Sequence, residues 1–291
     1  MQISTVLVQI LNGLQFGMLL FLIASGLTLT FGVMGIINLA HGAFFMLGAY
    51  GAFHLIKFAG WPFAAAYAGA ILAVVMLGAL VERSVLAPLA KRDHLDQVLV
   101  TYGLILIFDE LAVIAWGKDV QPAEIPPPFQ GSIQLSSMIV YPVYRLVIAA
   151  IGLLAALALY LLVAKTRLGM IVRAGSIDRD MVRALGINVR PIFSLVFGLG
   201  AAFAALAGIA AAPILSVSPG MGDRIIIVAF VVIVIGGIGS IKGAFVGALL
   251  VGLVDGFGKI LFPTVSSILM YGLMAAVLVW RPQGIFGKPL R

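Results

Sequence analysis

Long apolar stretches alternate with short polar stretches along almost the whole chain. Several apolar stretches reach about 20 residues with few ionisable side chains, the length that a helix needs to cross roughly 30 Å of hydrocarbon. The pattern predicts nine membrane-spanning helices, at residues 9–31, 36–56, 63–86, 97–116, 145–164, 191–213, 224–240, 244–261 and 264–280. The stretch 224–261 also fits broken or re-entrant helices. We therefore expect an all-α, polytopic membrane protein with 8–10 transmembrane helices.

Composition excludes an ordinary soluble protein. Hydrophobic residues make up 63% of the chain and charged residues 10%, and the mean hydropathy is +1.19. Residues 1–10 carry no basic side chain, and the apolar run that follows continues to about Val33. That run is too long for the core of a signal peptide, so we interpret it as a retained first span. We expect one transmembrane domain over residues 1–291.

The basic residues predict the orientation. In the nine-helix arrangement, 13 of the 18 fall on one side, and these are Arg83, Lys91, Arg92, the six between 165 and 190, Lys242, Arg281, Lys288 and Arg291. Cytoplasmic loops retain Lys and Arg, so topology explains the net charge of +7 better than a nucleic-acid partner does. The N-terminus is then external, the C-terminus cytoplasmic, the loop 165–190 cytoplasmic and the loop 117–144 external.

The external loop contains Pro126, Pro127 and Pro128, which predict an extended, stiff strut. Two interpretations stay open for this loop. It packs over the outer helix ends, or it forms a docking surface for an extracytoplasmic partner.

Signatures of catalysis are missing from the sequence. The stretch GGIGSIKG lacks the Lys-Ser/Thr pair of a phosphate-binding loop, so we expect no ATP hydrolysis on this chain. The three histidines do not have metal-ligand spacing, and there is no cysteine. We expect no enzyme, no metal site and no cofactor on this chain.

Polar residues within the spans are costly and mark candidate sites. Asn12 and Gln15 are three residues apart on one face of the first span, and Asn38 and His41 share a face at the start of the second. Each pair either lines a translocation path or makes hydrogen bonds between helices. Asp255 and Lys259 predict a local ion pair.

Two stretches resemble each other within the chain. His41-Gly42-Ala43-Phe44 matches Lys242-Gly243-Ala244-Phe245, and a glycine precedes each at the same offset. Transporters are often built from two such repeats with the path at their interface. Gly42 and Gly243 therefore join the candidate path.

The polar stretch 173–191 predicts a short capped helix over 177–185. Ser176 is its expected N-cap, Asp178 and Asp180 lie in its first turn, Arg183 lies in its last turn, and Gly186 follows at the position that favours positive φ. Ile177, Met181 and Leu185 form one apolar stripe. Such a helix lies in the headgroup layer or inserts into a groove of a cytoplasmic partner.

Five stretches in their order along the chain resemble the permease subunits of branched-chain amino acid ABC importers. They are GLTLTFGVMGIINLAHGAFFMLGAY (26–50), ERSVLAPL (82–89), RAGSIDRDMVRALGIN (173–188), GGIGSIKGAFVGALLVG (236–252) and RPQGIFG (281–287). The resemblance implies an inner-membrane permease that works with a second (LivM-like) permease subunit, two cytoplasmic ATPase subunits, which hydrolyse the ATP, and a periplasmic binding protein.

By the same resemblance, residues 176–186 are the coupling helix that contacts the ATPase. Its contact residues are Ser176, Ile177, Asp178, Arg179, Met181, Arg183, Leu185 and Gly186. Ala43 stands where such permeases often carry an acidic or polar residue, and Lys242 where proline is common. Related permeases carry urea, short amides or other amino acids, which are the alternative cargoes. The alternative outside the ABC importers is a stand-alone secondary carrier.

Overall fold

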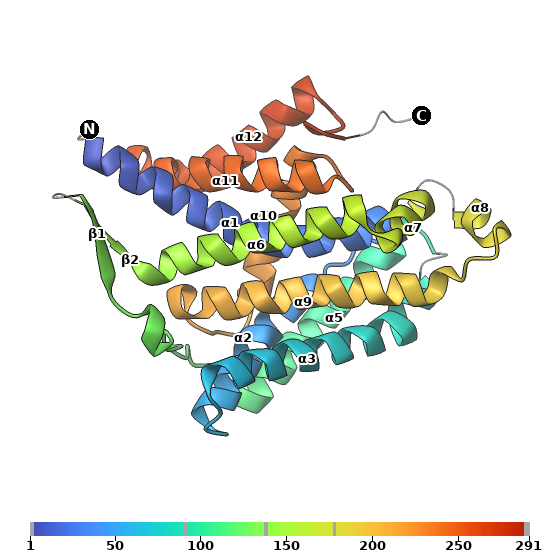
Figure 1. Ribbon diagram of the computed structural model, residues 1–291, viewed down its shortest axis with the longest axis horizontal. Coiled ribbons are helices and arrows are strands. Elements are labelled where there is room, and N and C mark those ends of the chain that lie inside the picture. The colour runs from blue at the N-terminus through green and yellow to red at the C-terminus, as the bar shows by residue number, and fades with distance from the viewer. Residues whose placement is uncertain (1–2, 90–91, 137–138, 177–178, 288–291) are drawn as a thin grey trace. The chain divides into compact units, whose positions relative to one another are not determined.

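The chain forms two compact units built from distant parts of the sequence. The computed structural model describes residues 3–89, 92–136, 139–176 and 179–287 (Figure 1). The first unit comprises Met1–Ala24, Glu124–Leu157 and Val228–Arg291, and the second comprises Ser25–Ala123 and Ala158–Ile227. Three helices contribute to both units: α1 (Ile3–Met34), α6 (Val143–Lys165) and α10 (Met221–Gly236).

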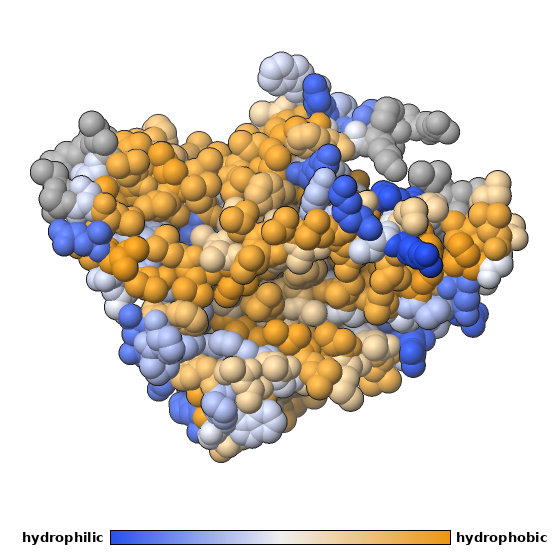
Figure 2. Space-filling view, viewed as in Figure 1, coloured by the Kyte–Doolittle hydropathy of each residue, from blue (hydrophilic) through white to orange (hydrophobic). Residues whose placement is uncertain are grey.

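Seven helical segments of the described chain are long and apolar enough to cross a membrane. They are α1, the segment Phe63–Leu89, α5 (His94–Trp116), α6, α9 (Val189–Leu215), α11 (Ile241–Leu261) and the segment Pro263–Trp280. Figure 2 shows apolar side chains over most of the visible face, as expected for a surface in contact with hydrocarbon. The protein is a polytopic helical membrane protein, as its sequence predicted.

Two of the nine expected spans are shorter than predicted. Helix α2 (His41–Lys57) has 17 residues and α10 has 16, so they rise about 25 Å, less than the roughly 30 Å of a hydrocarbon core. Glycines with positive φ flank both helices: Gly35 (64°) opens the bend that precedes α2, and Gly237 (101°) directly follows α10. Hydropathy alone extended the second span back to residue 36 because the residues of the bend are themselves apolar.

In the second unit, α2 packs against α9 and against α3 (Phe63–Val81), and α3 also packs against α9. Small residues permit this close approach. A β-carbon on Gly48 would lie 2.5 Å from the Cα atom of Ala205, so any larger residue there would separate α2 from α9. Helix α5 joins α2 through the stacked rings of Tyr50 and Trp116, whose centroids are 4.7 Å apart. The core of this unit therefore lies around α2.

In the first unit, α11 packs closely against the first part of α1. A β-carbon on Gly17 would lie 2.8 Å from the carbonyl oxygen of Ala248, and the Phe21 and Phe245 rings meet edge to face at 5.3 Å. Helix α11 is followed by the 3₁₀ turn Pro263–Val265 and by α12 (Ser266–Trp280), which packs back against it.

The expected external loop differs from the predicted strut. Pro127–Phe129 forms one 3₁₀ turn, and an antiparallel hairpin of β1 (Ser132–Ser136) and β2 (Ile139–Pro142) follows it. Pro126 precedes this turn, with φ of −53° and ψ of 137°. Proline favours the first positions of a 3₁₀ turn as well as polyproline helix, and here the turn leads the chain into the hairpin. The described part of the chain is therefore helical with one short sheet.

Candidate functional site

The expected coupling segment contains two short helices instead of one. Helix α7 (Arg167–Gly175) follows α6 directly, and its N-cap is Thr166, whose hydroxyl oxygen accepts a hydrogen bond from the Gly169 N–H at 3.1 Å. Gly169 has no room for a side chain because the carbonyl groups of α6 lie against it. Helix α7 is therefore folded back tightly onto the end of α6.

Ser176 ends α7, and the prediction that it caps the next helix is wrong. Its N–H donates to the Val172 carbonyl at 3.0 Å, and its hydroxyl donates back to the Arg173 carbonyl at 2.8 Å. A serine at the end of a helix can bond the preceding turn instead of the following one. The predicted residues Ile177 and Asp178 lie outside the described part of the chain.

Helix α8 (Arg179–Ala184) occupies the centre of the predicted coupling helix. It ends as predicted: Gly186 has φ of 79°, and its N–H donates to the Arg183 carbonyl at 2.9 Å. Met181 and Leu185 are 60% and 71% exposed, whereas Val182 is 3% exposed. The helix therefore contacts the protein through Val182 and presents Met181 and Leu185 outward, together with the exposed Arg183.

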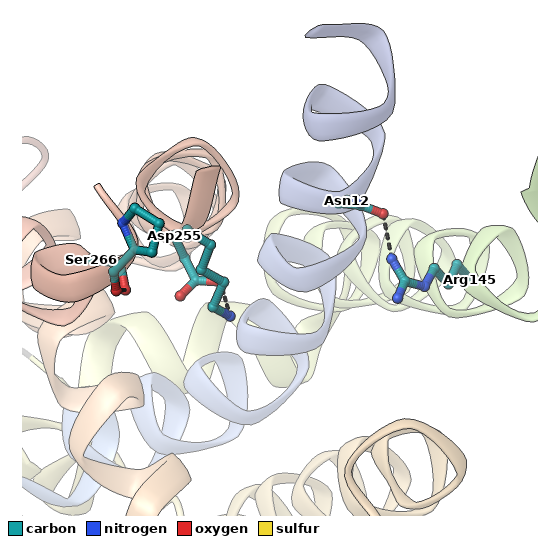
Figure 3. Close-up of polar contacts among 6 residues, drawn as sticks. Asn12, Arg145, Asp255 and Ser266 are labelled. Carbon is teal, nitrogen blue, oxygen red and sulfur yellow. Dashed lines mark hydrogen bonds and ion pairs between the residues drawn. The ribbon is translucent and has the colours of Figure 1, made fainter. Parts of the chain in front are cut away.

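In the first unit, the Asn12 side chain holds α1 to the start of α6. Its oxygen accepts a hydrogen bond from Arg145 (Figure 3). The same oxygen accepts a second hydrogen bond, of 3.2 Å, from the Tyr141 hydroxyl. Tyr141 is 1% exposed, and burial raises the pKa of its hydroxyl while Arg145 acts in the opposite direction. The hydroxyl thus stays protonated and able to donate. The sequence left open whether Asn12 makes hydrogen bonds between elements, and the structure shows that it does.

Two other polar features of this unit are Gln15 on α1 and an ion pair on α11. Gln15 is 6% exposed. The expected ion pair of α11 is present, with the Lys259 ammonium 2.6 Å from the Asp255 carboxylate (Figure 3). The Lys259 side chain is 62% exposed, so this pair contributes little to stability.

In the second unit, Asn38 lies outside the helix on which we expected it. Helix α2 begins at His41, and Asn38 belongs to the bend before it, so the two do not share a helical face. Asn38 is 1% exposed, and neither atom of its side-chain amide has a hydrogen-bond partner among the described residues. His41 is also 1% exposed, and its ring lies so close to Gly26 that a β-carbon there would be 2.9 Å from Nε2.

Gly42 and Gly243 each make a close contact within their own unit. A β-carbon on Gly42 would lie 2.5 Å from the carbonyl oxygen of Gly222, at the start of α10. Gly243, near the start of α11, is pressed still more closely against the carbonyl oxygen of Gly236. Both stretches thus place a glycine-to-glycine contact at the first turn of a helix. The repeat itself stays a prediction.

Sequence reasoning missed several residues that the fold brings together. Arg145 and Tyr141 gave no local signal of their contact with Asn12, and Ser194 gave none of its hydrogen bond to Glu82 at 2.8 Å. The one general hint was a positive charge, that of Arg145, in the first turn of an apolar span. In the described chain there is no cluster of three or more His, Asp or Glu side chains able to hold a metal ion.

Its fold defines this chain as a multi-pass helical membrane protein, and comparison with known proteins specifies the family. The family model for the permease component of the branched-chain amino acid transport system matches residues 9–278. The chain belongs to this permease family. No solved structure matches it significantly.

Named relatives align with nearly the whole chain. The high-affinity branched-chain amino acid transport system permease protein BraD of Pseudomonas aeruginosa is 33% identical, with 97% of this chain and 95% of BraD covered. The permease protein LivH of Escherichia coli K12 is 31% identical with the same coverage. A probable LivH of Methanocaldococcus jannaschii is 28% identical, with 92% and 89% covered.

Proposed function

We propose that this chain is a membrane permease subunit of an ABC importer for branched-chain amino acids. The observation that carries the proposal is the similarity to BraD and LivH over 97% of the chain, since it includes every predicted span and the polar segment 165–190. Leucine, isoleucine and valine have apolar side chains that cross an apolar path readily, and their charged ends need only a few polar groups or helix termini.

In this proposal the energy comes from partner subunits. Two cytoplasmic ATPase subunits hydrolyse ATP, a second permease subunit completes the path, and a periplasmic binding protein delivers the cargo. This chain is then not an enzyme and holds no cofactor. It lies in the inner membrane, with the N-terminus outside and the C-terminus in the cytoplasm, as the distribution of basic residues supports.

The segment around α8 is the proposed ATPase contact. Met181 and Leu185 form an exposed apolar pair on a helix that Val182 anchors to the protein, which suits insertion into a partner groove. Arg183 lies beside them and would contact the rim of that groove. Asn38, His41 and Gly42 in the second unit, and Asn12, Gln15 and Gly243 in the first, remain the candidate path residues.

The proposal is tested by reconstitution into proteoliposomes. We expect ATP-dependent uptake of labelled leucine, isoleucine and valine when the chain is combined with all partner subunits, and neither uptake nor ATP hydrolysis by the chain alone. Urea and acetamide serve as competing cargoes. Uptake by the chain alone, driven by a proton or sodium gradient, would contradict the proposal in favour of a secondary carrier.

A further inference from the structure

A buried carboxylate joins α3 to α9 close to the coupling segment. Glu82 follows the last residue of α3 and is 5% exposed. The Ser194 hydroxyl of α9 donates a hydrogen bond of 2.8 Å to its Oε2 atom. Among the described residues, Ser194 is the side-chain donor to this carboxylate. The contact connects residues 112 positions apart in the sequence.

The backbone at Glu82 is a π turn, Glu82–Leu86, followed by the short helix α4 (Ala87–Leu89). The Ala87 N–H donates to the Glu82 carbonyl, five residues back. Pro88 has no N–H to donate to the Ser84 carbonyl, which accounts for the departure from α-helical bonding. Such turns inside helices are frequent at functional sites.

Stability alone does not account for this pair. One turn earlier, α3 and α9 already meet through small and apolar residues, because a β-carbon on Gly78 would lie 3.0 Å from the Ala201 β-carbon. A buried carboxylate with one hydroxyl donor costs more free energy than an apolar pair of similar volume. The pair therefore needs another explanation.

The position of the Glu82–Ser194 pair near the start of α9 suggests an explanation. Ser194 lies five residues after the first residue of α9, about 7.5 Å along the helix axis. The preceding connection is tight, since the Ile187 N–H donates to the Val182 carbonyl and the Asn188 side chain caps α9. Phe193, next to Ser194, lies 3.8 Å from where a side chain on Gly175 of α7 would begin. A displacement of α8 thus reaches the first turns of α9 directly.

We infer that Glu82 is a positioning residue for transport: its hydrogen bond with Ser194 passes displacement of the α8 segment from α9 into α3. A hydrogen bond holds only within a narrow range of distance and angle, so the pair links the two helices more specifically than apolar contact does. This inference rests on the proposed function, in which α8 binds the ATPase.

The test compares variants of the complete importer in proteoliposomes, measuring cargo transported per ATP hydrolysed. Ser194→Ala and Glu82→Ala remove the bond, whereas Glu82→Gln keeps an acceptor oxygen. Ser84→Ala is the matched control, because the exposed Ser84 hydroxyl donates to the Leu80 carbonyl within its own helix.

We expect Ser194→Ala to assemble with its partners and keep basal ATP hydrolysis, while cargo per ATP falls by about tenfold or more, the lower bound for losing a hydrogen bond to a charged group. Glu82→Gln should stay within about twofold and Ser84→Ala should be unchanged.

A wild-type ratio in Ser194→Ala would overturn the inference, and so would loss of assembly, which indicates a merely structural pair. If Glu82→Ala does not fold, Ser194→Ala still tests the inference by itself. Failure of the proposed function is distinct from these outcomes, because the wild-type importer would then show no ATP-driven uptake.

Discussion

Gly42 and Gly222 occupy positions where neither residue can carry a side chain. The first turn of α2 meets the start of α10 there, and a β-carbon on Gly42 would lie 2.5 Å from the Gly222 carbonyl oxygen. Because backbone atoms form the contact, no rotamer change relieves it. The fit of these two short helices therefore depends on glycine at both positions.

Gly42→Leu is expected to abolish uptake, since the side chain must push α2 and α10 apart. Gly103→Leu in α5 is the matched control, because a β-carbon there meets nothing within 4 Å. The measurement is leucine uptake by the reconstituted importer, together with the amount of protein inserted in the membrane. Normal uptake by Gly42→Leu would show that the contact is not needed for transport.

Accessibility of introduced cysteines tests the orientation. The chain has no cysteine, and Ser132 in β1 and Arg183 in α8 are both exposed. In intact cells, Ser132→Cys should react with an impermeant thiol reagent, whereas Arg183→Cys should react only after the membrane is permeabilised. The opposite labelling would overturn both the orientation and the ATPase contact.

Met181→Asp is expected to weaken ATPase binding without unfolding the chain, because Met181 is 60% exposed in the subunit. In a partner groove the new carboxylate would be buried without a counter-charge, at a cost of several kcal/mol. Pull-down of the ATPase subunits measures the loss. Val182→Asp is the contrasting variant: Val182 is 3% exposed, so this change should destabilise the permease itself. A helix that merely lies on the bilayer would keep its ATPase in Met181→Asp.

Gly186→Val should disturb the exit from α8. Its φ of 79° is unfavourable for a β-branched residue, with an expected cost of about 1–3 kcal/mol. The spans should stay intact, while stimulated ATP hydrolysis by the assembled importer falls. Gly60→Val is the comparison, because Gly60 has a similar φ of 67° in another turn. Equal effects of both variants on hydrolysis would argue against a special role for the α8 exit.

Asn12→Leu should lower the stability of the permease by about 1–3 kcal/mol, because Arg145 and Tyr141 lose their common acceptor. Thermal unfolding in detergent measures the change. Lys259→Ala is the control, since it breaks an exposed ion pair worth at most about 1 kcal/mol. If the two variants were equally stable, the Asn12 contacts would not hold α1 to α6.

The sequence by itself determined the helical membrane class, the approximate positions of the apolar helices and the turn at Gly186. These features depend on local properties, namely the length of apolar runs and the conformational preference of single residues. These local properties do not depend on where the rest of the chain lies. The resemblance to branched-chain amino acid permeases is likewise carried by the order of short stretches, and the family match confirms it.

Only the tertiary structure decided where the polar side chains find partners. Ser176 could cap the following helix or close the preceding one, and the existence of α7 settled that competition. Asn38 looked helical because the bend before α2 is itself apolar. The Arg145–Asn12 and Ser194–Glu82 bonds join residues more than a hundred positions apart, and helix packing brings them together. Hydropathy describes the environment of each residue, whereas a hydrogen bond depends on the relative placement of two helices.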